Sequence, residues 1–401
     1  MKVLQINSVC GVGSTGRIAT DIHKILKDQG HGSYIAFGRG TSLNCDNSIK
    51  IGTEYDNYTH VALTRLFDKH GFGSRKATQD FIRIIEDINP DIVHLHNIHG
   101  YYINIKILFE YLKKVNKPVI WTLHDCWPFT GHCAHFDFIG CEKWKTSCNK
   151  CPQKVEYPKS ITLDNSKNNF IDKKGIFTGV NNLTIVTPSN WLARLVKESF
   201  LGEYPVKVIN NGIDLQTFKP TQSNFRNQYN LNNKFLILGV ASVWSERKGL
   251  DTFVKMANKL GEDTKIVLVG VSAKQKLNLP SNILVIERTN NIAELAEIYS
   301  VADVFVNPTL EDNFPTTNLE ALSCGTPVIT YATGGSIESV FDGCGYVSEK
   351  GNLNELISNI CRIKKDGKTI YQKSCLNISK VYYDKTIAYK KYIDLYTEQC
   401  R

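Results

Sequence analysis

Short apolar runs that alternate with helical stretches constrain the fold of this chain most strongly. In the first half, such runs lie at residues 2–9, 91–96, 118–124 and 183–187. In the second half, they lie at residues 235–241, 265–270, 283–286, 304–306 and 327–330. Strands that alternate with helices form a parallel sheet with both faces covered. The sequence therefore predicts an α/β protein with two doubly wound domains.

The polar segment 218–224 separates the two sets of runs. Because 401 residues are enough for two domains, we expect an N-terminal domain at residues 1–217 and a C-terminal domain at residues 218–385. Residues 386–401 have helical spacing and are expected to form a closing helix. Ligands of doubly wound sheets bind at the carboxyl ends of the strands, so two facing domains would share one inter-domain cleft.

Positive charge is concentrated in the first half of the chain. Residues 1–200 contain 25 Lys and Arg against 18 Asp and Glu, whereas residues 201–401 contain 23 against 21. This excess suggests an anionic partner, such as a membrane surface, a phosphate group or a nucleic acid; a solvated lysine-rich surface is the alternative. The sequence has neither a long unbroken apolar run nor a secretory signal, so we expect a cytoplasmic protein.

A glycine-rich turn, 11–17, follows the first apolar run and opens a helix. Glycines let a backbone approach a ligand closely, and the start of a helix offers N–H groups to an anion. Gly11, Gly13 and Gly16 have the spacing of the dinucleotide fingerprint G-x-G-x-x-G, but this spacing alone is a weak signal. A plain strand-to-helix turn explains the pattern equally well.

His124 and Asp125 follow another strand-like run, where an open α/β sheet presents its site. A histidine at this position can form hydrogen bonds with a sugar hydroxyl or a leaving phosphate. His124 is therefore a functional candidate. Most of the other histidines nearby are expected to be structural and hydrogen-bonded.

The segment 310–327 contains the most specific pattern. Asp312 and Glu320 stand eight positions apart, and a helix is expected to begin near Thr316. Threonines and backbone N–H groups at such a start suit a diphosphate, and Glu320 could accept hydrogen bonds from two ribose hydroxyls. A capping box with surface acids is the alternative, although it does not require the strand entry at 324–328.

In their order and spacing, these motifs resemble those of family 4 of the retaining glycosyltransferases, over nearly the whole chain. The resemblance rests on the segments 210–214, 247–249, 312–320 and 324–329, and on Gly334 and Gly335 with Glu338. The stretches 13–17, 94–100 and 124–133 are similar to those of bacterial enzymes of colanic-acid, capsule and O-antigen synthesis. The family has the B-type fold (GT-B) of two facing Rossmann-like domains. The resemblance implies that the closing helix, 386–401, crosses back to the N-terminal domain.

The resemblance implies transfer of a hexose-type sugar from a nucleotide diphosphate sugar to a polyprenyl-diphosphate-linked saccharide, with the anomeric configuration retained. The N-terminal domain would bind the acceptor and the C-terminal domain the donor. The candidate catalytic residues are His124, Asp312 and Lys248. The candidate donor-binding residues are Gly13, Ser14, Thr15, Gly16, Arg247, Lys248, Asp312, Asn313, Phe314, Pro315, Thr316, Thr317 and Glu320.

Each candidate takes its role from the motif that it matches. Lys248 would neutralise the donor diphosphate, Glu320 would hold the ribose, and Asp312 would contact hydroxyls of the transferred sugar. His124 would lie near the anomeric centre. The turn at 13–16 would close over the donor from the other domain.

Two positions depart from the family pattern. Asp312 stands where the family usually has glutamate, and Ser242 stands where it usually has arginine. The shorter side chain of Asp312 affects which hydroxyls of the sugar the enzyme can contact, and therefore which donor it uses. No D-x-D pair occurs in the sequence. Its absence agrees with a mechanism that uses no catalytic divalent metal. In such a mechanism Lys248, Arg247 and helix N-termini supply the positive charge. No organic cofactor is expected.

Twelve cysteines are many for a cytoplasmic protein, and an insertion at about 126–174 holds a cluster of them. Four thiolates are enough for a tetrahedral structural zinc, with unbonded cysteines as the alternative. The candidate ligands are Cys133, Cys141, Cys148 and Cys151.

The insertion also places lysines beside aromatic residues, which suits an anionic membrane surface and a lipid-linked acceptor. A solvated loop packed by its own aromatics is the alternative. We therefore expect peripheral attachment to the inner face of the cytoplasmic membrane.

Two other classes of function stay open at this point. A nicotinamide-dependent oxidoreductase would need, besides the G-x-G-x-x-G spacing, an acidic residue about 20 positions further on, and residues 29–45 contain none. A non-catalytic nucleotide-binding component of a polysaccharide assembly complex has only the two departures in its favour. Nucleic acid is not an expected partner once the resemblance is considered, and the sequence does not give the oligomeric state.

Overall fold

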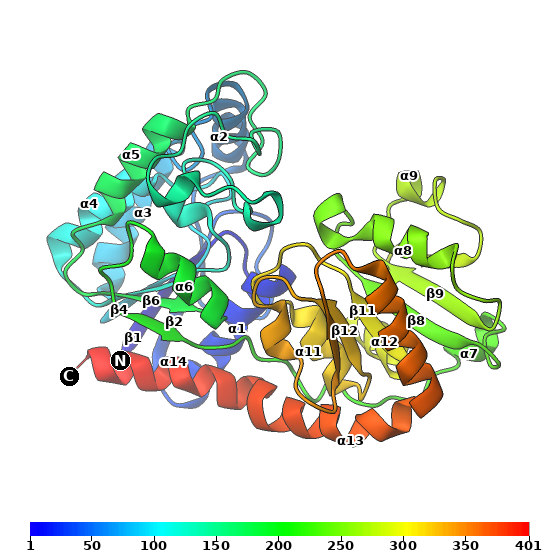
Figure 1. The fold of residues 1–401 in the computed structure, drawn as a ribbon. Coiled ribbons are helices and arrows are strands. Elements are labelled where there is room, and N and C mark those ends of the chain that lie inside the picture. The colour runs from blue at the N-terminus through cyan, green and yellow to red at the C-terminus, as the bar shows by residue number, and fades with distance from the viewer. Residues whose placement is uncertain (401) are drawn as a thin grey trace. The chain divides into compact units, whose positions relative to one another are not determined.

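A computed structural model of the chain describes residues 1–400 (Figure 1). The chain divides into two compact units. Unit 1 consists of Met1–Asn210 together with the residues from Tyr389 onward, and unit 2 consists of Asn211–Ala388. Each unit contains its own fully parallel sheet. The predicted class, α/β with two doubly wound sheets, is confirmed.

The sheet of unit 1 has seven strands in the order β3-β2-β1-β4-β5-β6-β7. These are β1 (Lys2–Asn7), β2 (Gly32–Phe37), β3 (Ser48–Lys50), β4 (Ile92–Leu95), β5 (Val119–Thr122), β6 (Leu183–Thr187) and β7 (Val206–Val208). The helices are α1 (Gly13–Asp28), α2 (Glu54–Phe67), α3 (Arg75–Ile88), α4 (Ile105–Val115), α5 (Ser166–Phe177) and α6 (Asn190–Glu198). The central strands β4, β5 and β6 are buried throughout, because helices cover both faces.

Three strands of unit 1 have no long apolar run in the sequence and were not predicted. β2 begins with Gly32 and Ser33, so its apolar part is short. β3 and β7 are three-residue edge strands, each with a lysine. Their pairing in the sheet, rather than local hydrophobicity, places them in extended conformation.

The sheet of unit 2 has six strands in the order β10-β9-β8-β11-β12-β13. These are β8 (Phe235–Val240), β9 (Thr264–Val269), β10 (Ile283–Ile286), β11 (Val304–Asn307), β12 (Val328–Tyr331) and β13 (Gly345–Ser348). The helices are α7 (Phe225–Gln228), α8 (Leu250–Ala257), α9 (Ala273–Lys276), α10 (Ile292–Val301), α11 (Thr316–Ser323), α12 (Leu353–Asp366) and α13 (Lys368–Ile378). The edge strand β13 is an addition to the five predicted strands; it is short and only partly buried, so its sequence signal is weak.

The change from unit 1 to unit 2 lies at Asn210. Ile213 and Phe218 are buried in the hydrophobic core of unit 2. Ile213 also pairs with Asp384 in an isolated parallel bridge. Residues 211–217 therefore belong structurally to unit 2, although they precede the polar segment 218–224.

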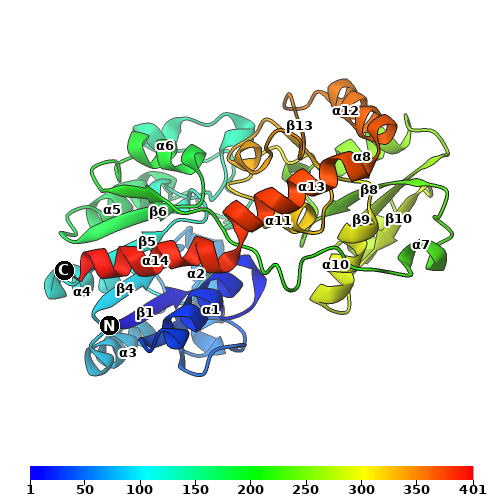
Figure 2. The ribbon, with the colours of Figure 1, turned by 90° about the horizontal axis from the view of Figure 1, so that it is seen from below.

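The closing helix, α14 (Lys385–Gln399), begins in unit 2 and continues in unit 1. In unit 1 it lies beside the strands of the sheet (Figure 2). The Tyr392 hydroxyl lies 3.1 Å from Oγ1 of Thr122 on β5, and the Tyr396 hydroxyl lies 2.7 Å from Nδ1 of His94 on β4. Among residues 1–400, no helix combines the length and apolar character that crossing a membrane requires.

Candidate active site

The donor-side candidates lie where two neighbouring strands of unit 2 end. β8 and β11 are adjacent in the sheet; the turn η4 (Glu246–Lys248) follows β8, and the segment 308–315 follows β11. Because the carboxyl ends of parallel strands meet at one edge, Lys248 and Asp312 come together although they are far apart in sequence. Nζ of Lys248 lies 2.5 Å from Oδ2 of Asp312. The two side chains are only 26% and 16% exposed, so solvent screens this ion pair less than a surface pair.

The backbone that carries Asp312 is held from two sides. Gly335 N donates to Asp312 O at 3.0 Å, and a Cβ at Gly334 would lie only 2.0 Å from that same oxygen. Gly334 also has a φ of +53°, so this close approach requires glycine. On the other side, Nη1 of Arg247 donates to Glu311 O at 2.6 Å. Arg247 therefore links η4 to the segment after β11.

Helix α11 begins at Thr316, as predicted, directly after this segment. The residue before this helix, Pro315, provides no side-chain cap. Thr316 and Thr317 are half-buried, whereas Phe314 and Pro315 are buried. The start of α11 therefore presents backbone N–H groups and two hydroxyls beside the Lys248–Asp312 pair, an arrangement that suits an anion.

Glu320 points into unit 2 rather than lying on an exposed face of α11. Glu320 is only 3% exposed, and its Oε2 accepts a hydrogen bond from the Tyr299 hydroxyl at 2.9 Å. Tyr299 lies on α10 and gave no signal in the sequence as a partner of this carboxylate. A second buried group lies nearby on α11, where Asn318 contacts Asn307 and the hydroxyls of Ser336 and Ser339.

In unit 1, polar side chains gather after β4 and β5. Nε2 of His124 lies 3.2 Å from Nδ1 of His96, and Nε2 of His96 lies 3.0 Å from the side-chain oxygen of Gln5. Oδ2 of Asp125 lies 2.9 Å from Nε2 of His99, whose Nδ1 lies 2.8 Å from the Tyr157 hydroxyl. Because β4 and β5 are adjacent, their carboxyl ends bring His124 and His96 together in one hydrogen-bonded group. In the sequence these histidines were visible only as separate residues.

Burial and neighbouring groups together set the protonation states of His124 and Asp125. Burial lowers the pKa of His124 to about 4, so the imidazole is neutral near pH 7. For Asp125, burial alone would raise the pKa, but the neighbouring His99 outweighs it and the pKa falls to about 2. At neutral pH the site in unit 1 therefore offers a neutral imidazole beside a carboxylate.

The residues predicted to form a glycine loop are the first turn of a helix. α1 begins at Gly13, not near Arg17 as the sequence suggested, so Gly13, Ser14, Thr15 and Gly16 are helical. The residue before this helix, Val12, provides no side-chain cap, and Gly13 and Ser14 are exposed. An exposed, uncapped helix start is the same anion-binding feature that α11 has in unit 2.

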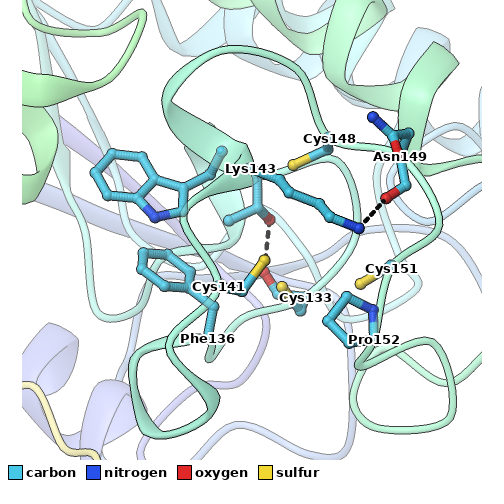
Figure 3. Close-up of a pocket in the computed structure, with 10 residues that line it drawn as sticks. Cys133, Phe136, Cys141, Lys143, Cys148, Asn149, Cys151 and Pro152 are labelled. Atoms are coloured by element: carbon cyan, nitrogen blue, oxygen red, sulfur yellow. Dashed lines mark hydrogen bonds between the residues drawn. The ribbon is translucent and has the colours of Figure 1, made fainter.

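The four clustered cysteines line one small pocket in the insertion (Figure 3). Cys133 and Cys148 are buried, and Gly131 N donates to Sγ of Cys148 at 3.2 Å. A hydrogen bond from Cys133 lowers the pKa of Cys151 to about 7. Among residues 1–400, however, no three of these sulfur atoms lie within 4.8 Å of one another. The pocket places the cysteines together, and closure of a metal site would require rotation of their side chains.

The insertion itself is packed rather than open. Phe136 stacks on Trp144 and Phe129 packs against it at a tilt, with ring centroids 5.0 and 5.3 Å from it. Lys173 is buried; its Nζ donates to Trp127 O at 2.7 Å and lies 3.5 Å from the Trp127 ring centroid. Burial lowers the pKa of Lys173 to about 7. This lysine therefore stabilises the insertion and is not part of a solvated basic surface.

The buried histidines predict a decrease in stability in acid. Burial lowers the pKa of His94 to about 3, below the value near 6.5 of an unfolded chain. Between these values the unfolded chain binds a proton that the folded chain does not, so the free energy of unfolding falls as the pH decreases. His94 contributes up to about 1.4 kcal/mol per pH unit. Urea unfolding at pH 7, 6 and 5 should give a shallower slope for His94→Gln than for the wild type; equal slopes would contradict this assignment.

Comparison with known proteins identifies the family. A model of Glycosyltransferase Family 4 matches residues 15–217, about half of the chain. The chain belongs to glycosyltransferase family 4. A model of the group 1 glycosyl transferases matches residues 221–380, so the family assignment extends over both units.

Relatives of this family 4 enzyme agree with the assignment. A putative colanic acid biosynthesis glycosyl transferase of Escherichia coli K12 is 29% identical over 344 residues, which is 82% of each chain. A galactosyltransferase of Escherichia coli, named as acting from UDP-Gal on α-D-GlcNAc-diphosphoundecaprenol, is 27% identical over 45% of this chain and 51% of its own length. The predicted class, a nucleotide-sugar-dependent glycosyltransferase, is confirmed.

A solved structure shows the same fold. Sucrose-phosphate synthase from Thermosynechococcus elongatus has a TM-score of 0.74 with this family 4 enzyme, at 18% identity over 99% of both chains. At this identity the likeness shows the fold alone. It confirms the predicted GT-B fold.

Proposed function

We propose that this enzyme transfers a hexose-type sugar, with retention, from a nucleoside diphosphate sugar to a polyprenyl-diphosphate-linked saccharide during synthesis of a bacterial surface polysaccharide. The observation that carries the proposal is the Lys248–Asp312 pair beside the uncapped start of α11. The names of the two Escherichia coli relatives support the substrate class, since one refers to colanic acid and the other to a diphosphoundecaprenol acceptor.

The geometry of unit 2 supports a division of roles within the donor site. Lys248 neutralises the diphosphate as charge develops on it, and the N–H groups and hydroxyls of Thr316 and Thr317 bind its oxygens. Asp312, fixed through its backbone by Gly335, accepts hydrogen bonds from hydroxyls of the transferred sugar. The Glu320 carboxylate binds the ribose.

The chemistry then needs no enzyme nucleophile and no catalytic metal. The bond between the anomeric carbon and the diphosphate oxygen breaks, and its electron pair leaves with the diphosphate. The acceptor hydroxyl adds on the same face, and its proton passes to a phosphate oxygen of the leaving group. We propose for unit 1 that His124, neutral at pH 7, forms a hydrogen bond with a sugar hydroxyl, and that the N–H groups of the first turn of α1 bind an anionic group.

A panel of nucleotide sugars, incubated with polyprenyl-diphosphate saccharides, tests the proposal. Transfer from one UDP- or GDP-linked hexose, with product analysis by mass spectrometry and NMR, should give the retained anomer. Binding of a nucleotide without hydrolysis or transfer from any donor would instead favour a non-catalytic component of a polysaccharide assembly complex. An inverted product would contradict the proposed mechanism.

We further propose that an exposed apolar surface of unit 1 lies on the inner face of the cytoplasmic membrane. Leu66 and Phe67 at the end of α2 are 46% and 50% exposed, and Ile161 and Leu163 in the insertion are 62% and 52% exposed. Ile161 N donates to Arg65 O at 2.7 Å, so the two segments are adjacent. Apolar side chains with arginine and lysine beside them bind anionic lipid surfaces.

Paired aspartate substitutions test the membrane surface. Ile161→Asp with Leu163→Asp should reduce co-sedimentation with vesicles of anionic lipid by roughly tenfold or more, because buried apolar area is lost and negative charge is added. Ile370→Asp is the matched control, since Ile370 is 66% exposed on α13 of unit 2. Equal vesicle binding by all three proteins would contradict the proposal.

We also propose a structural zinc ion in the cysteine pocket of the insertion. Four thiols on one pocket supply the ligand set that structural zinc uses, and zinc would draw the sulfur atoms together. Protein purified without an affinity column should contain zinc that Cys141→Ser loses, together with a lower Tm. Cys361→Ser, at an exposed position on α12, is the control. Unchanged zinc content in Cys141→Ser would contradict the assignment.

A further inference from the structure

A second group of metal-ligating side chains lies in unit 1, outside the residues discussed above. Among residues 1–400, His23, Cys45 and Asp46 form the one group of at least three His, Cys, Asp or Glu side chains whose ligand atoms all lie within 4.8 Å of one another. His23 lies on α1, and Cys45 and Asp46 lie between β2 and β3. We propose that these three side chains bind a divalent metal ion of the zinc class.

The distances around His23 fit such a site. Nε2 of His23 lies 2.8 Å from Oδ1 of Asp46, and its Nδ1 lies 2.9 Å from the Ser33 hydroxyl. In a tetrahedral zinc site with bonds of about 2.0–2.3 Å, neighbouring ligand atoms are roughly 3.3–3.8 Å apart. A small movement of Asp46, whose side chain is 60% exposed, would therefore admit the ion. Ser33 would hold the second nitrogen, as the outer partners of ligating histidines do.

The charges at the group also fit a divalent cation. The Cys45 thiolate and the Asp46 carboxylate together supply two negative charges. Lys27 lies 3.2 Å from Oδ2 of Asp46; the carboxylate oxygen that lies beside His23 is Oδ1.

The ion would connect two segments of unit 1, α1 and the loop between β2 and β3. Cys10, which is buried, precedes the turn into α1, and Cys45 packs against the small core around it. Leu43 N donates to Cys10 O at 3.2 Å, and a Cβ at Gly11 would lie 2.2 Å from Leu43 O. A metal at His23, Cys45 and Asp46 would fix the segment 43–46 against this turn. It would therefore stabilise the backbone that leads into the first turn of α1.

Metal analysis of matched variants tests the site independently of any transferase activity. Full-length protein is purified under reducing conditions without chelators or an affinity column, and zinc is measured by inductively coupled plasma mass spectrometry. Cys45→Ser and Asp46→Asn should each contain about one equivalent less than the wild type, and Cys361→Ser should contain as much as the wild type. Asp46 is exposed and asparagine has its shape, so this variant is expected to fold.

Cobalt provides a second measurement. After replacement of zinc by Co²⁺, the thiolate charge-transfer absorption of the wild type should decrease in Cys45→Ser but not in Cys361→Ser. Equal metal content and equal spectra in the wild type, Cys45→Ser and Asp46→Asn would overturn the proposal. A Cys10–Cys45 disulfide in the freshly purified native protein, found by mass spectrometry, would also overturn it, because the thiolate would then be lost.

Discussion

Replacing Lys248 with alanine is expected to lower kcat for sugar transfer by roughly 10²–10³-fold, because loss of one group that stabilises developing charge costs about this much. Lys248 is the cation that the structure places against Asp312 at the start of α11. The folded state should change little, since a partly exposed ion pair contributes about 1 kcal/mol or less. Initial rates at saturating donor, with Tm measured alongside, provide the test.

Two further variants define the role of Lys248. Lys373→Ala removes an exposed lysine from α13 and should keep the wild-type kcat. Lys248→Arg keeps the positive charge and should recover part of the activity, although its planar head group is placed differently. A folded Lys248→Ala variant with kcat within threefold of the wild type would contradict the proposed donor site.

Glu320→Gln is expected to raise KM for the nucleotide sugar by about tenfold to a hundredfold, with a smaller change in kcat. Hydrogen bonds to a charged acceptor contribute about 1.5–3 kcal/mol, and each 1.4 kcal/mol corresponds to about tenfold. Glutamine is chosen because Glu320 is only 3% exposed, so alanine would also leave a cavity inside unit 2. Steady-state kinetics over a range of donor concentrations measures the split between KM and kcat.

Tyr299→Phe separates ribose binding from packing. It removes the hydroxyl that donates to Glu320 at 2.9 Å but leaves the carboxylate in place. We expect KM to change by less than about threefold, with a loss of stability of about 1 kcal/mol. If Tyr299→Phe raised KM as much as Glu320→Gln, the carboxylate would act by positioning α11 rather than by holding the donor.

The strands that could be predicted are those whose own residues form a continuous apolar run. β4, β5 and β6 are buried on both faces and therefore have unbroken apolar runs. β13 lies at the edge of its sheet, is partly exposed and begins with Gly345, so it needs its neighbour β12 to become a strand. The start of α11 at Thr316 was also predictable, because Pro315 and the threonines mark a helix start.

The donor motifs could be found in the sequence, but their surroundings could not. The spacing of Asp312 and Glu320 suggested two similar acids on a loop and helix. In the structure, one is half-buried against Lys248 and the other is directed at Tyr299 inside the unit. Spacing in the sequence places Asp312 on the loop and Glu320 on the helix. It does not give their partners, Lys248 of η4 and Tyr299 of α10, which are distant in sequence.

By itself, the sequence determined the α/β class and the family, because both depend on local periodicity and on motifs that occupy consecutive residues. Only the tertiary structure decided which distant groups meet. The parallel order of β8 and β11 brings Lys248 to Asp312, and the packing of the 43–46 segment brings Cys45 and Asp46 to His23. These contacts follow from the order of strands in a sheet and the path of a loop, and neither is encoded in the local pattern of residues.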